Sequence, residues 1–289
     1  MLKDIIKVLA CPVCRGRMRL TTGTTTSALT CEVGHAFDVS RQRYVNLLPG
    51  GAARPASSDT PEMLDARARF LASGHFKPIA AAVVAAVLGG ASPADPASDL
   101  TVAEVGAGTG YYLVRALDAL PKAVGLALDS SKPAARRAAH AHCRAGSVVC
   151  DVWQGLPVAD ASLDLVLNVF APRNPTEFAR VLRPGGSLLL VTPTPAHLAE
   201  IIAPLGMISV DAEKPVRLAA SLETHFAECF ARRIEAPMSL DASAVADLAM
   251  MGPSSRHIEP AALTARVDAL ATPVRVTLSV DVRRFGLRR

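Results

Sequence analysis

The sequence predicts an α/β protein in which a mostly parallel, doubly wound sheet follows a small metal-binding module at the N-terminus. Three observations predict this fold. Short apolar runs alternate with helical segments from residue 101 onward, a glycine-rich turn follows the first of these runs, and three cysteines and a histidine lie at metal-ligand spacing within residues 1–45. Strands that alternate with helices pair in parallel, with helices on both faces of the sheet.

The composition indicates a buried core and no membrane span. Half of the 289 residues are apolar and the mean hydropathy is +0.28, whereas disordered chains are poor in apolar residues. The longest apolar run, residues 79–88, is about half of the ~20 residues that a bilayer requires. Residues 8–11 resemble a lipoprotein cleavage box, but Asp4 and Lys7 interrupt the apolar stretch that a signal peptide needs. We therefore expect a cytoplasmic protein.

The excess positive charge lies in the N-terminal quarter of the chain. The net charge is +5, and residues 1–77 hold 11 Lys and Arg against 6 Asp and Glu, so the remaining residues are neutral as a group. This distribution fits a well-solvated surface and equally fits an anionic partner, most plausibly nucleic acid.

Three cysteines and a histidine in the N-terminal module have the spacing of a zinc site. Cys11 and Cys14 form a Cys-x2-Cys pair, and after sixteen residues Cys31 and His35 form a Cys-x3-His pair. Three thiolates and an imidazole make the closed tetrahedral set of a structural zinc ion. A redox pair would need neither Cys31 nor His35, and a disulfide framework is rare in a cytosolic chain. We expect one structural Zn²⁺, with a redox role as the weaker alternative.

The chain divides into three parts. We expect a zinc-binding module over residues 1–45, a linker and helical connection over 46–78, and a Rossmann-like domain over 79–289. The linker is rich in Gly, Pro, Ala and Ser, and the helical stretch after it breaks near Gly74 and Pro78. Buried strands are expected at residues 101–105, 123–128, 147–150, 163–170 and 187–192, and residues 276–285 have the two-residue period of an edge strand.

The glycine-rich turn after the first strand predicts a nucleoside-binding site. Gly106, Gly108 and Gly110 let the backbone turn tightly and approach a ligand without a Cβ in the way. Asp129 ends the second strand, where a carboxylate binds ribose hydroxyls, and Asp151 ends the third, where it can meet an adenine amine.

The spacing of this turn favours S-adenosylmethionine over NAD. A dinucleotide fingerprint has the pattern Gly-x-Gly-x-x-Gly, but position 111 is Tyr. The tighter Gly-x-Gly-x-Gly turn with Glu104 upstream, and the segment LRPGGSLLLVTP, resemble the class I methyltransferases. The rings of Tyr111 and Tyr112 either face the sulfonium or pack beneath the first helix.

The acceptor atom is inferred from motifs that the sequence lacks. Enzymes that methylate exocyclic amines usually carry Asn/Asp-Pro-Pro-aromatic after the fourth strand, where this chain has NVFAPRNP. Enzymes that methylate carbon 5 of pyrimidines use a cysteine near that site, and Cys143, Cys150 and Cys229 lie elsewhere in the sequence. Direct transfer to a nitrogen or an oxygen remains.

The basic zinc module and the methyltransferase motifs together resemble the 23S ribosomal RNA guanine-N1 methyltransferases, including those that give producers of tylosin-type macrolides self-resistance. The resemblance covers essentially the whole chain and is most specific in CPVC…CEVGHAFD, RYVNLLP, MLDARARFLASGHFKPI, VGAGTGYY, FAP and TPTPAHL. It implies methylation of N1 of a guanine in a hairpin loop of 23S rRNA domain II, near the peptide exit tunnel where macrolides bind.

The resemblance also implies roles for particular residues. The zinc ligands would be Cys11, Cys14, Cys31 and His35, and the cofactor pocket would be lined by Phe76, Glu104, Gly106, Gly108, Gly110, Tyr112, Leu113, Asp129, Asp151 and His197. Relatives carry tyrosine at the position of Phe76. The catalytic residue is unknown: Asp151, Asp164 and water are candidates for accepting the N1 proton, and the amide of Asn168 for orienting the base. Arginines of the module would bind RNA phosphates, namely Arg15, Arg17, Arg19, Arg41 and Arg43.

Two other functions compete with this one. The chain could be a small-molecule O- or N-methyltransferase of secondary metabolism with the zinc module as a cap, but the basic N-terminal quarter counts against that. It could also be a zinc-bearing nucleic-acid-binding regulator with a vestigial pocket, but the intact glycine turn and Asp129 count against that. One hairpin held by two zinc modules would favour a homodimer.

Overall fold

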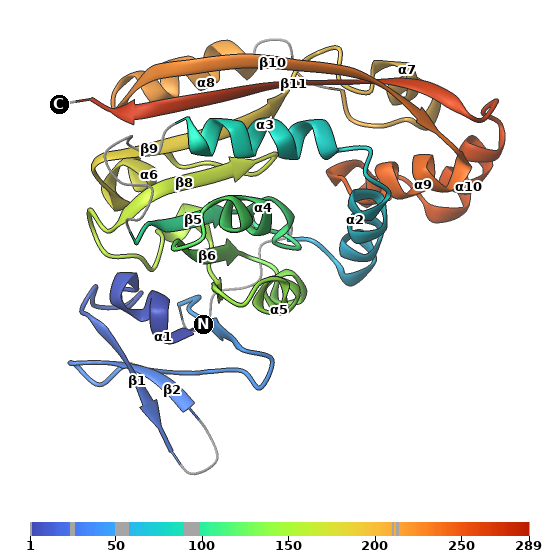
Figure 1. Ribbon diagram of the computed structural model, residues 1–289. Helices are drawn as coiled ribbons and strands as arrows, with labels where there is room; N and C mark the ends of the chain where they lie inside the picture. Colours follow the sequence, from blue (N-terminus) through green and yellow to red (C-terminus); the bar gives the residue numbers. More distant parts are fainter. Residues whose placement is uncertain are drawn as a thin grey trace.

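Two sheets of different size organise the chain (Figure 1). The computed structural model describes residues 2–23, 27–49, 58–89, 99–209, 211 and 214–288. The smaller sheet is antiparallel, has the order β1-β2-β3, and belongs to the N-terminal module. Its strands are β1 (Met18–Thr22), β2 (Ser27–Cys31) and β3 (Ala36–Asp38).

The larger sheet has eight strands in the order β10-β11-β9-β8-β5-β6-β7-β4. Pairing is parallel from β4 to β9 and antiparallel for β11 and β10. The strands are β4 (Tyr44–Asn46), β5 (Thr101–Val105), β6 (Val124–Asp129), β7 (Ala145–Val149), β8 (Leu163–Val169), β9 (Leu182–Pro193), β10 (Phe226–Leu240) and β11 (Val274–Leu287). The predicted doubly wound sheet is thus confirmed. The strand order reverses between β5 and β8, and ligands of such sheets bind at the carboxyl ends of the strands beside this reversal.

Helices cover both faces of the large sheet (Figure 1). They are α1 (Leu2–Ile5), α2 (Pro61–Ser73), α3 (Lys77–Leu88), α4 (Tyr111–Ala119), α5 (Lys132–Ala141), α6 (Pro175–Val181), α7 (Ala199–Leu205), α8 (Lys214–Glu223), α9 (Ala242–Met250) and α10 (Pro260–Asp268), with 3-10 turns at Ile6–Val8, Val152–Gln154 and Pro253–Arg256. Side-chain caps begin several of them: Thr60, Ser131 and Asn174 accept hydrogen bonds from the first turns of α2, α5 and α6.

The predicted break in the helical connection is confirmed. Gly74 ends α2 in the left-handed conformation, with φ +88°, and α3 begins three residues later, which is the usual role of glycine after a helix. Among the described residues, no single helix is long and apolar enough to cross a membrane. By length and composition α2 and α3 pass that test only as a pair, with a bend of 82° between them.

The outer strand of the sheet differs from the prediction. Residues 276–285 do form a strand, within β11, but β11 lies between β9 and β10 and is therefore not an edge strand. The edge strand on this side of the sheet is β10, which was not predicted from the sequence. Most of its residues are exposed, so it lacks the regular apolar alternation by which a strand is recognised. β9 also begins earlier than expected, at Leu182.

The N-terminal module shares a hydrophobic core with the large sheet. Cys11, Cys31 and Leu29 belong to the same buried cluster as Leu126 and Phe178 of the sheet and its helices. Ile5 packs so closely on Gly146 of β7 that a Cβ there would approach it to less than 3.0 Å. β4 then extends the large sheet by pairing with β7. The zinc module is therefore joined to the sheet by packing and by hydrogen bonds.

Candidate active site and metal centre

The four predicted zinc ligands converge on one point. The Sγ atoms of Cys11, Cys14 and Cys31 and a ring nitrogen of His35 all lie within 4.8 Å of one another. The Cys14–Cys31 sulfurs are 3.6 Å apart, and His35 Nδ1 lies 3.3 Å from the Cys31 sulfur. Tetrahedral Zn–S and Zn–N bonds require separations of about 3.8 Å and about 3.5 Å. The donor set and its spacing therefore fit a structural zinc ion.

Two tight turns produce this convergence. In the first, the Arg15 amide donates to the Cys11 carbonyl; in the second, the Gly34 amide donates to the Cys31 carbonyl. Gly34 has φ +99°, a conformation that favours glycine. Each turn therefore directs its two side chains toward the same side of the backbone.

The glycine turn lies at the carboxyl end of β5, beside the reversal of strand order. Gly106, Gly108 and Gly110 all have positive φ, at +75°, +54° and +80°. A Cβ at Gly106 would approach the Ala171 methyl group to less than 3.0 Å, and one at Gly108 would meet the Arg67 guanidinium at 2.7 Å. The positive φ values and the close contact at Gly106 favour glycine here, and a tight turn of this kind after the first strand is where such sheets bring their backbone close to a nucleoside cofactor.

Asp129 closes one side of this cradle. Its carboxylate accepts hydrogen bonds of 2.8 Å from the amides of Gly108 and Ser131. Burial raises the pKa of Asp129, and these two bonds oppose that rise. The segment before α2 lies alongside, because the Ser131 hydroxyl donates to the Asp59 carbonyl at 2.7 Å. Asp129, which is predicted to bind the ribose, thus lies directly against the glycine turn.

Glu104 and Tyr112 lie beneath the turn. Glu104 is 1% exposed and accepts a 2.9 Å hydrogen bond from the Leu113 amide. Burial raises its pKa to about 8. The Tyr112 hydroxyl is buried with no hydrogen-bond partner among the described residues, which leaves a polar atom beside the cradle for a ligand or water to satisfy. Burial also raises the pKa of Tyr112.

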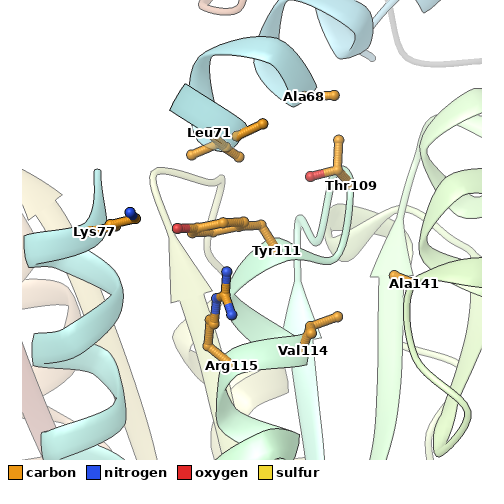
Figure 2. Close-up of a pocket in the computed structure, with 9 residues that line it drawn as sticks. Ala68, Leu71, Lys77, Thr109, Tyr111, Val114, Arg115 and Ala141 are labelled. Atoms are coloured by element: carbon orange, nitrogen blue, oxygen red, sulfur yellow. The ribbon is translucent and has the colours of Figure 1, made fainter. Parts of the chain in front are cut away.

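The two adjacent tyrosines point in different directions. Tyr111 lines a pocket of about 380 Å³ between α2 and α4, together with Thr109, Lys77 and Arg115 (Figure 2). The Arg115 guanidinium lies over the Tyr111 ring, 5.3 Å from its centre. Tyr112 is 7% exposed and packs edge-on against Tyr111. Tyr111 therefore lines an outer pocket, whereas Tyr112 belongs to the core.

Three rings gather where β8 and β9 end. Phe170 stacks on His197 with centroids 5.8 Å apart, and Phe76 lies 6.0 Å from His197 and 6.2 Å from Phe170. His197 Nδ1 accepts from the Ser279 amide at 3.2 Å, so the ring proton is on Nε2. Burial lowers the pKa of His197 to about 4. A neutral histidine and two phenyl rings thus border the reversal of strand order.

Phe170 begins the FAP segment of the family resemblance but was not among the predicted site residues. It is 39% exposed and has φ +54°, an uncommon backbone conformation for an aromatic residue. Strain of this kind clusters at functional sites. Arg67 was also missed: it lies over Gly108 and pairs with Asp59 at 2.5 Å. Its position inside the amphipathic helix α2 gave no sign of this contact.

The three candidate catalytic residues lie in different places. Asp151 follows β7 at the carboxyl edge, where its oxygens accept from the Trp153 amide and the Gln154 side chain. Both amide hydrogens of Asn168 donate to backbone carbonyls. Asp164 begins β8 at the opposite edge of the sheet, where it accepts from the Thr101 amide and pairs with an arginine. Asp164 therefore lies away from the glycine turn and makes structural contacts.

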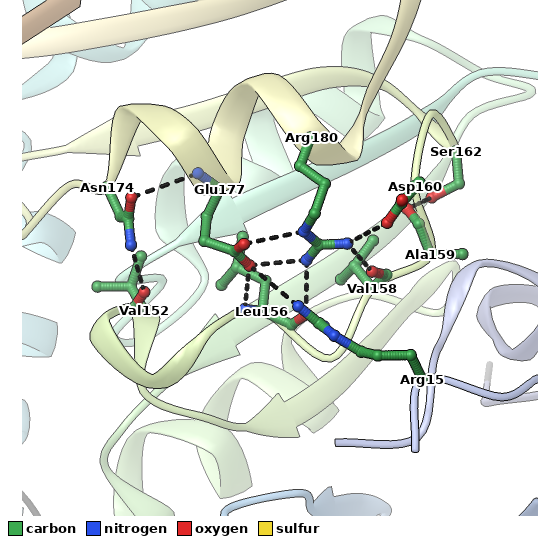
Figure 3. Close-up of polar contacts among 10 residues, drawn as sticks. All are labelled: Arg15, Val152, Leu156, Val158, Ala159, Asp160, Ser162, Asn174, Glu177 and Arg180. Atoms are coloured by element: carbon green, nitrogen blue, oxygen red, sulfur yellow. Dashed lines mark hydrogen bonds and ion pairs between the residues drawn. The ribbon is translucent and has the colours of Figure 1, made fainter. Parts of the chain in front are cut away.

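Arg15, one of the arginines expected to contact RNA, also connects two elements of the structure (Figure 3). Its Nη1 donates to the Leu156 carbonyl at 2.7 Å, and its Nη2 lies 3.8 Å from Glu177. Arg180 donates to the same carboxylate and the same carbonyl. Burial would raise the pKa of Glu177, but hydrogen bonds from Arg180 and from the Leu156 amide keep it below its usual range. Arg15 thereby links the zinc turn to α6.

The other four arginines of the module are exposed, and two of them flank β4. Arg17 and Arg19 lie after the first zinc turn and on β1, and Arg41 and Arg43 lie on the turn before β4. The exposed side chains place positive charge on the surface of the module.

Comparisons with known proteins agree with this architecture. Residues 9–54 match the zinc-ribbon family described as RlmA, N-terminal, and residues 102–186 match the methyltransferase domain family. A putative 23S rRNA (guanine-N(1)-)-methyltransferase of Micromonospora griseorubida is 48% identical over 98% of both chains. The 23S rRNA (guanine(748)-N(1))-methyltransferase of Streptomyces fradiae is 44% identical over 97% of both. A putative 23S rRNA (guanine-N(1)-)-methyltransferase, YxjB of Bacillus subtilis, is 32% identical over 66% of both.

The strand order, the glycine turn and the two family matches define a class I S-adenosylmethionine-dependent methyltransferase with an N-terminal zinc ribbon. Its cofactors are S-adenosylmethionine and one zinc ion. The extent of the similarity identifies the family: the chain belongs to the 23S rRNA (guanine-N1)-methyltransferases.

Proposed function

We propose that this protein methylates N1 of one guanine in a hairpin loop of 23S rRNA domain II and thereby contributes to macrolide resistance. The observation that carries the proposal is the similarity of 44% and 48% over nearly the full length, zinc ribbon included, to relatives named for that reaction. We further propose the guanine equivalent to the one numbered 748 in the name of the Streptomyces fradiae relative. A ribosomal substrate would place the enzyme in the cytoplasm.

The glycine turn and its neighbours would hold the cofactor. Gly106 and Gly108 would form the tight turn against the cofactor, Asp129 would bind the ribose hydroxyls, and Asp151 would meet the adenine. His197, which stays neutral, presents its Nε2–H beside the same edge. When bound, S-adenosylmethionine supplies an electrophilic methyl group on a positively charged sulfur, and aromatic rings near such a cation are favourable.

The chemistry requires an unpaired guanine. N1 lies on the Watson–Crick edge and bears a proton, so the base must be flipped out or lie in a loop to reach the cofactor. Transfer then depends mainly on holding N1 in line with the methyl group. Phe170, 39% exposed just after β8, would stack on the base, and the Asn168 amide keeps the following loop in position through its bonds to backbone carbonyls. Because Asp164 lies near the amino end of β8, away from the glycine turn, Asp151 and water remain as candidates for accepting the N1 proton.

The zinc module would hold the RNA outside the active site. Arg17, Arg19, Arg41 and Arg43 would bind phosphates, which fixes the register of a hairpin without reading its sequence. Shared packing with the large sheet would keep these charges at a constant distance from the cofactor site. We also propose a homodimer in which two modules grip one hairpin, to be tested by sedimentation of the protein with and without RNA.

Primer extension tests the proposal directly. The protein is incubated with S-adenosylmethionine and 23S rRNA, and reverse transcription is run across domain II. N1-methylation blocks base pairing, so we expect a stop at one guanine. The stop should weaken with Asp129→Ala and persist with the surface control Asp268→Ala, whose side chain is exposed at the end of α10. Read-through at every guanine would refute the proposal and would favour a small molecule as the methyl acceptor.

A further inference from the structure

A basic groove lies between the N-terminal module and the methyltransferase domain, outside the sites described so far. It has a volume of about 560 Å³ and runs between β4 and α5. Gln42 and Tyr44 line it on one side, and Lys132, Arg136 and Arg137 line it on the other. Among the described residues, no acidic side chain lines the groove. We refer to it as the α5 groove.

Two of the three cations in the α5 groove are available to a ligand. Arg137 pairs with Asp65 at 2.5 Å and also donates to the Pro61 carbonyl, so its charge is matched within the protein. Lys132 and Arg136 are exposed, and neither forms an ion pair with a residue in the described ranges. They lie four residues apart on α5 and so project from the same face of the helix, where like charges repel. An anion between them would remove this repulsion.

The α5 groove continues the basic surface of the zinc module. β4 pairs in parallel with β7, with Tyr44 opposite Ser147, and this pairing fixes the turn that carries Arg41 and Arg43 beside α5. Tyr44 is half-buried and contributes an aromatic ring to the wall. Cations beside an aromatic ring that lines a groove form a common surface for binding a nucleic-acid strand, in which phosphates meet the charges and a base stacks on the ring.

We propose that the α5 groove binds the sugar–phosphate backbone of the RNA substrate, with Lys132 and Arg136 each contacting a phosphate and Tyr44 stacking on a base. The inference rests on the proposed function, because it takes the substrate to be RNA. It adds a second contact, on the methyltransferase domain, to the arginines of the zinc module. The hairpin would then bridge the junction between the module and α5.

A paired comparison of charge removal tests this contact. The groove variant is Lys132→Ala/Arg136→Ala, and alanine is well tolerated in a helix. The matched control is Arg232→Ala/Arg275→Ala. It removes two exposed arginines from β10, the edge strand farthest from β4, and from its neighbour β11. Binding of an unmethylated domain II hairpin is measured by fluorescence anisotropy between 50 and 200 mM salt, without cofactor.

The groove variant should bind the hairpin at least about tenfold more weakly than the control variant. Its plot of log affinity against log salt should be shallower by about 1.4–1.8, because each lost phosphate contact changes the slope by about 0.7–0.9. Affinity for S-adenosylmethionine, measured by calorimetry, should equal that of the wild type. The charge-reversed variant Lys132→Glu/Arg136→Glu should weaken hairpin binding further.

Four results would overturn the inference. Equal losses in the groove and control variants would show an effect of net charge alone. A loss of cofactor affinity in place of RNA affinity would assign the α5 groove to the cofactor site. If the wild-type protein produces the primer-extension stop while the groove variant binds the hairpin like the control, the α5 groove is refuted and the proposed function stands. If the wild type binds no hairpin, both fail together.

Discussion

Replacing Arg15 with alanine separates a structural link from an RNA contact. The mutation removes the 2.7 Å hydrogen bond to the Leu156 carbonyl and the 3.8 Å ion pair with Glu177. A hydrogen bond to a charged group contributes about 1.5–3 kcal/mol, and a half-exposed ion pair adds less than about 1 kcal/mol. Arg180 still bonds both partners, so no buried acceptor loses its last bond. We therefore expect a loss of about 1–2 kcal/mol in the free energy of unfolding.

Thermal unfolding and RNA binding together measure this loss. For a chain of 289 residues, 1–2 kcal/mol corresponds to a Tm about 2–3 °C lower. The matched control is Arg17→Ala, on the same module and exposed, which should leave Tm unchanged and reduce the salt slope of hairpin binding by about 0.7–0.9. The reasoning is refuted if Arg15→Ala keeps the wild-type Tm and reduces the salt slope as Arg17→Ala does.

Three further predictions concern the cofactor site. Gly106→Ala forces a Cβ onto Ala171 at φ +75°, so calorimetry should show cofactor affinity at least about tenfold weaker, since the left-handed conformation alone costs about 1–2 kcal/mol. Burial raises the pKa of Glu104 from 4.5 to about 8; stability from this group is therefore complete below pH 4.5 and is lost as pH rises through 8. Urea unfolding should show that slope in the wild type and lose it in Glu104→Gln. Burial lowers the pKa of His197 to about 4, so its ring-proton NMR signals should not shift between pH 5.5 and 8.

The parts of the site that sequence analysis predicted well depend on short spacings. Cys11 and Cys14 lie on one turn and Cys31 and His35 on another, and the structure brings the four side chains together. The same holds for the glycine turn, because its conformation follows from residues within five positions of one another. In both places the function requires particular residue types at short spacings that are uncommon for other reasons. The sequence pattern alone was therefore sufficient to predict the site.

The parts that it missed depend on pairing between distant segments. β10 is held by β11, more than thirty residues later in the chain, and its exposed residues give no apolar period. Arg67 reaches Gly108 and the Met251 carbonyl only because α2 folds over the glycine turn. The composition limits the types of contact that a chain can form, but it does not tell which residues will meet.

Arg15 shows why a charge count alone overstates a nucleic-acid surface. Five arginines of the module contribute to the positive excess of the N-terminal quarter, yet one of them is committed to the Leu156 carbonyl and Glu177. Conversely, α5 lies in a part of the sequence whose charges cancel, and it still presents Lys132 and Arg136 to the α5 groove. Net charge over a segment counts cations without regard to their partners. Ion pairs within the folded protein decide which cations remain for an RNA strand to meet. Here those cations lie on both sides of the junction between the module and the methyltransferase domain.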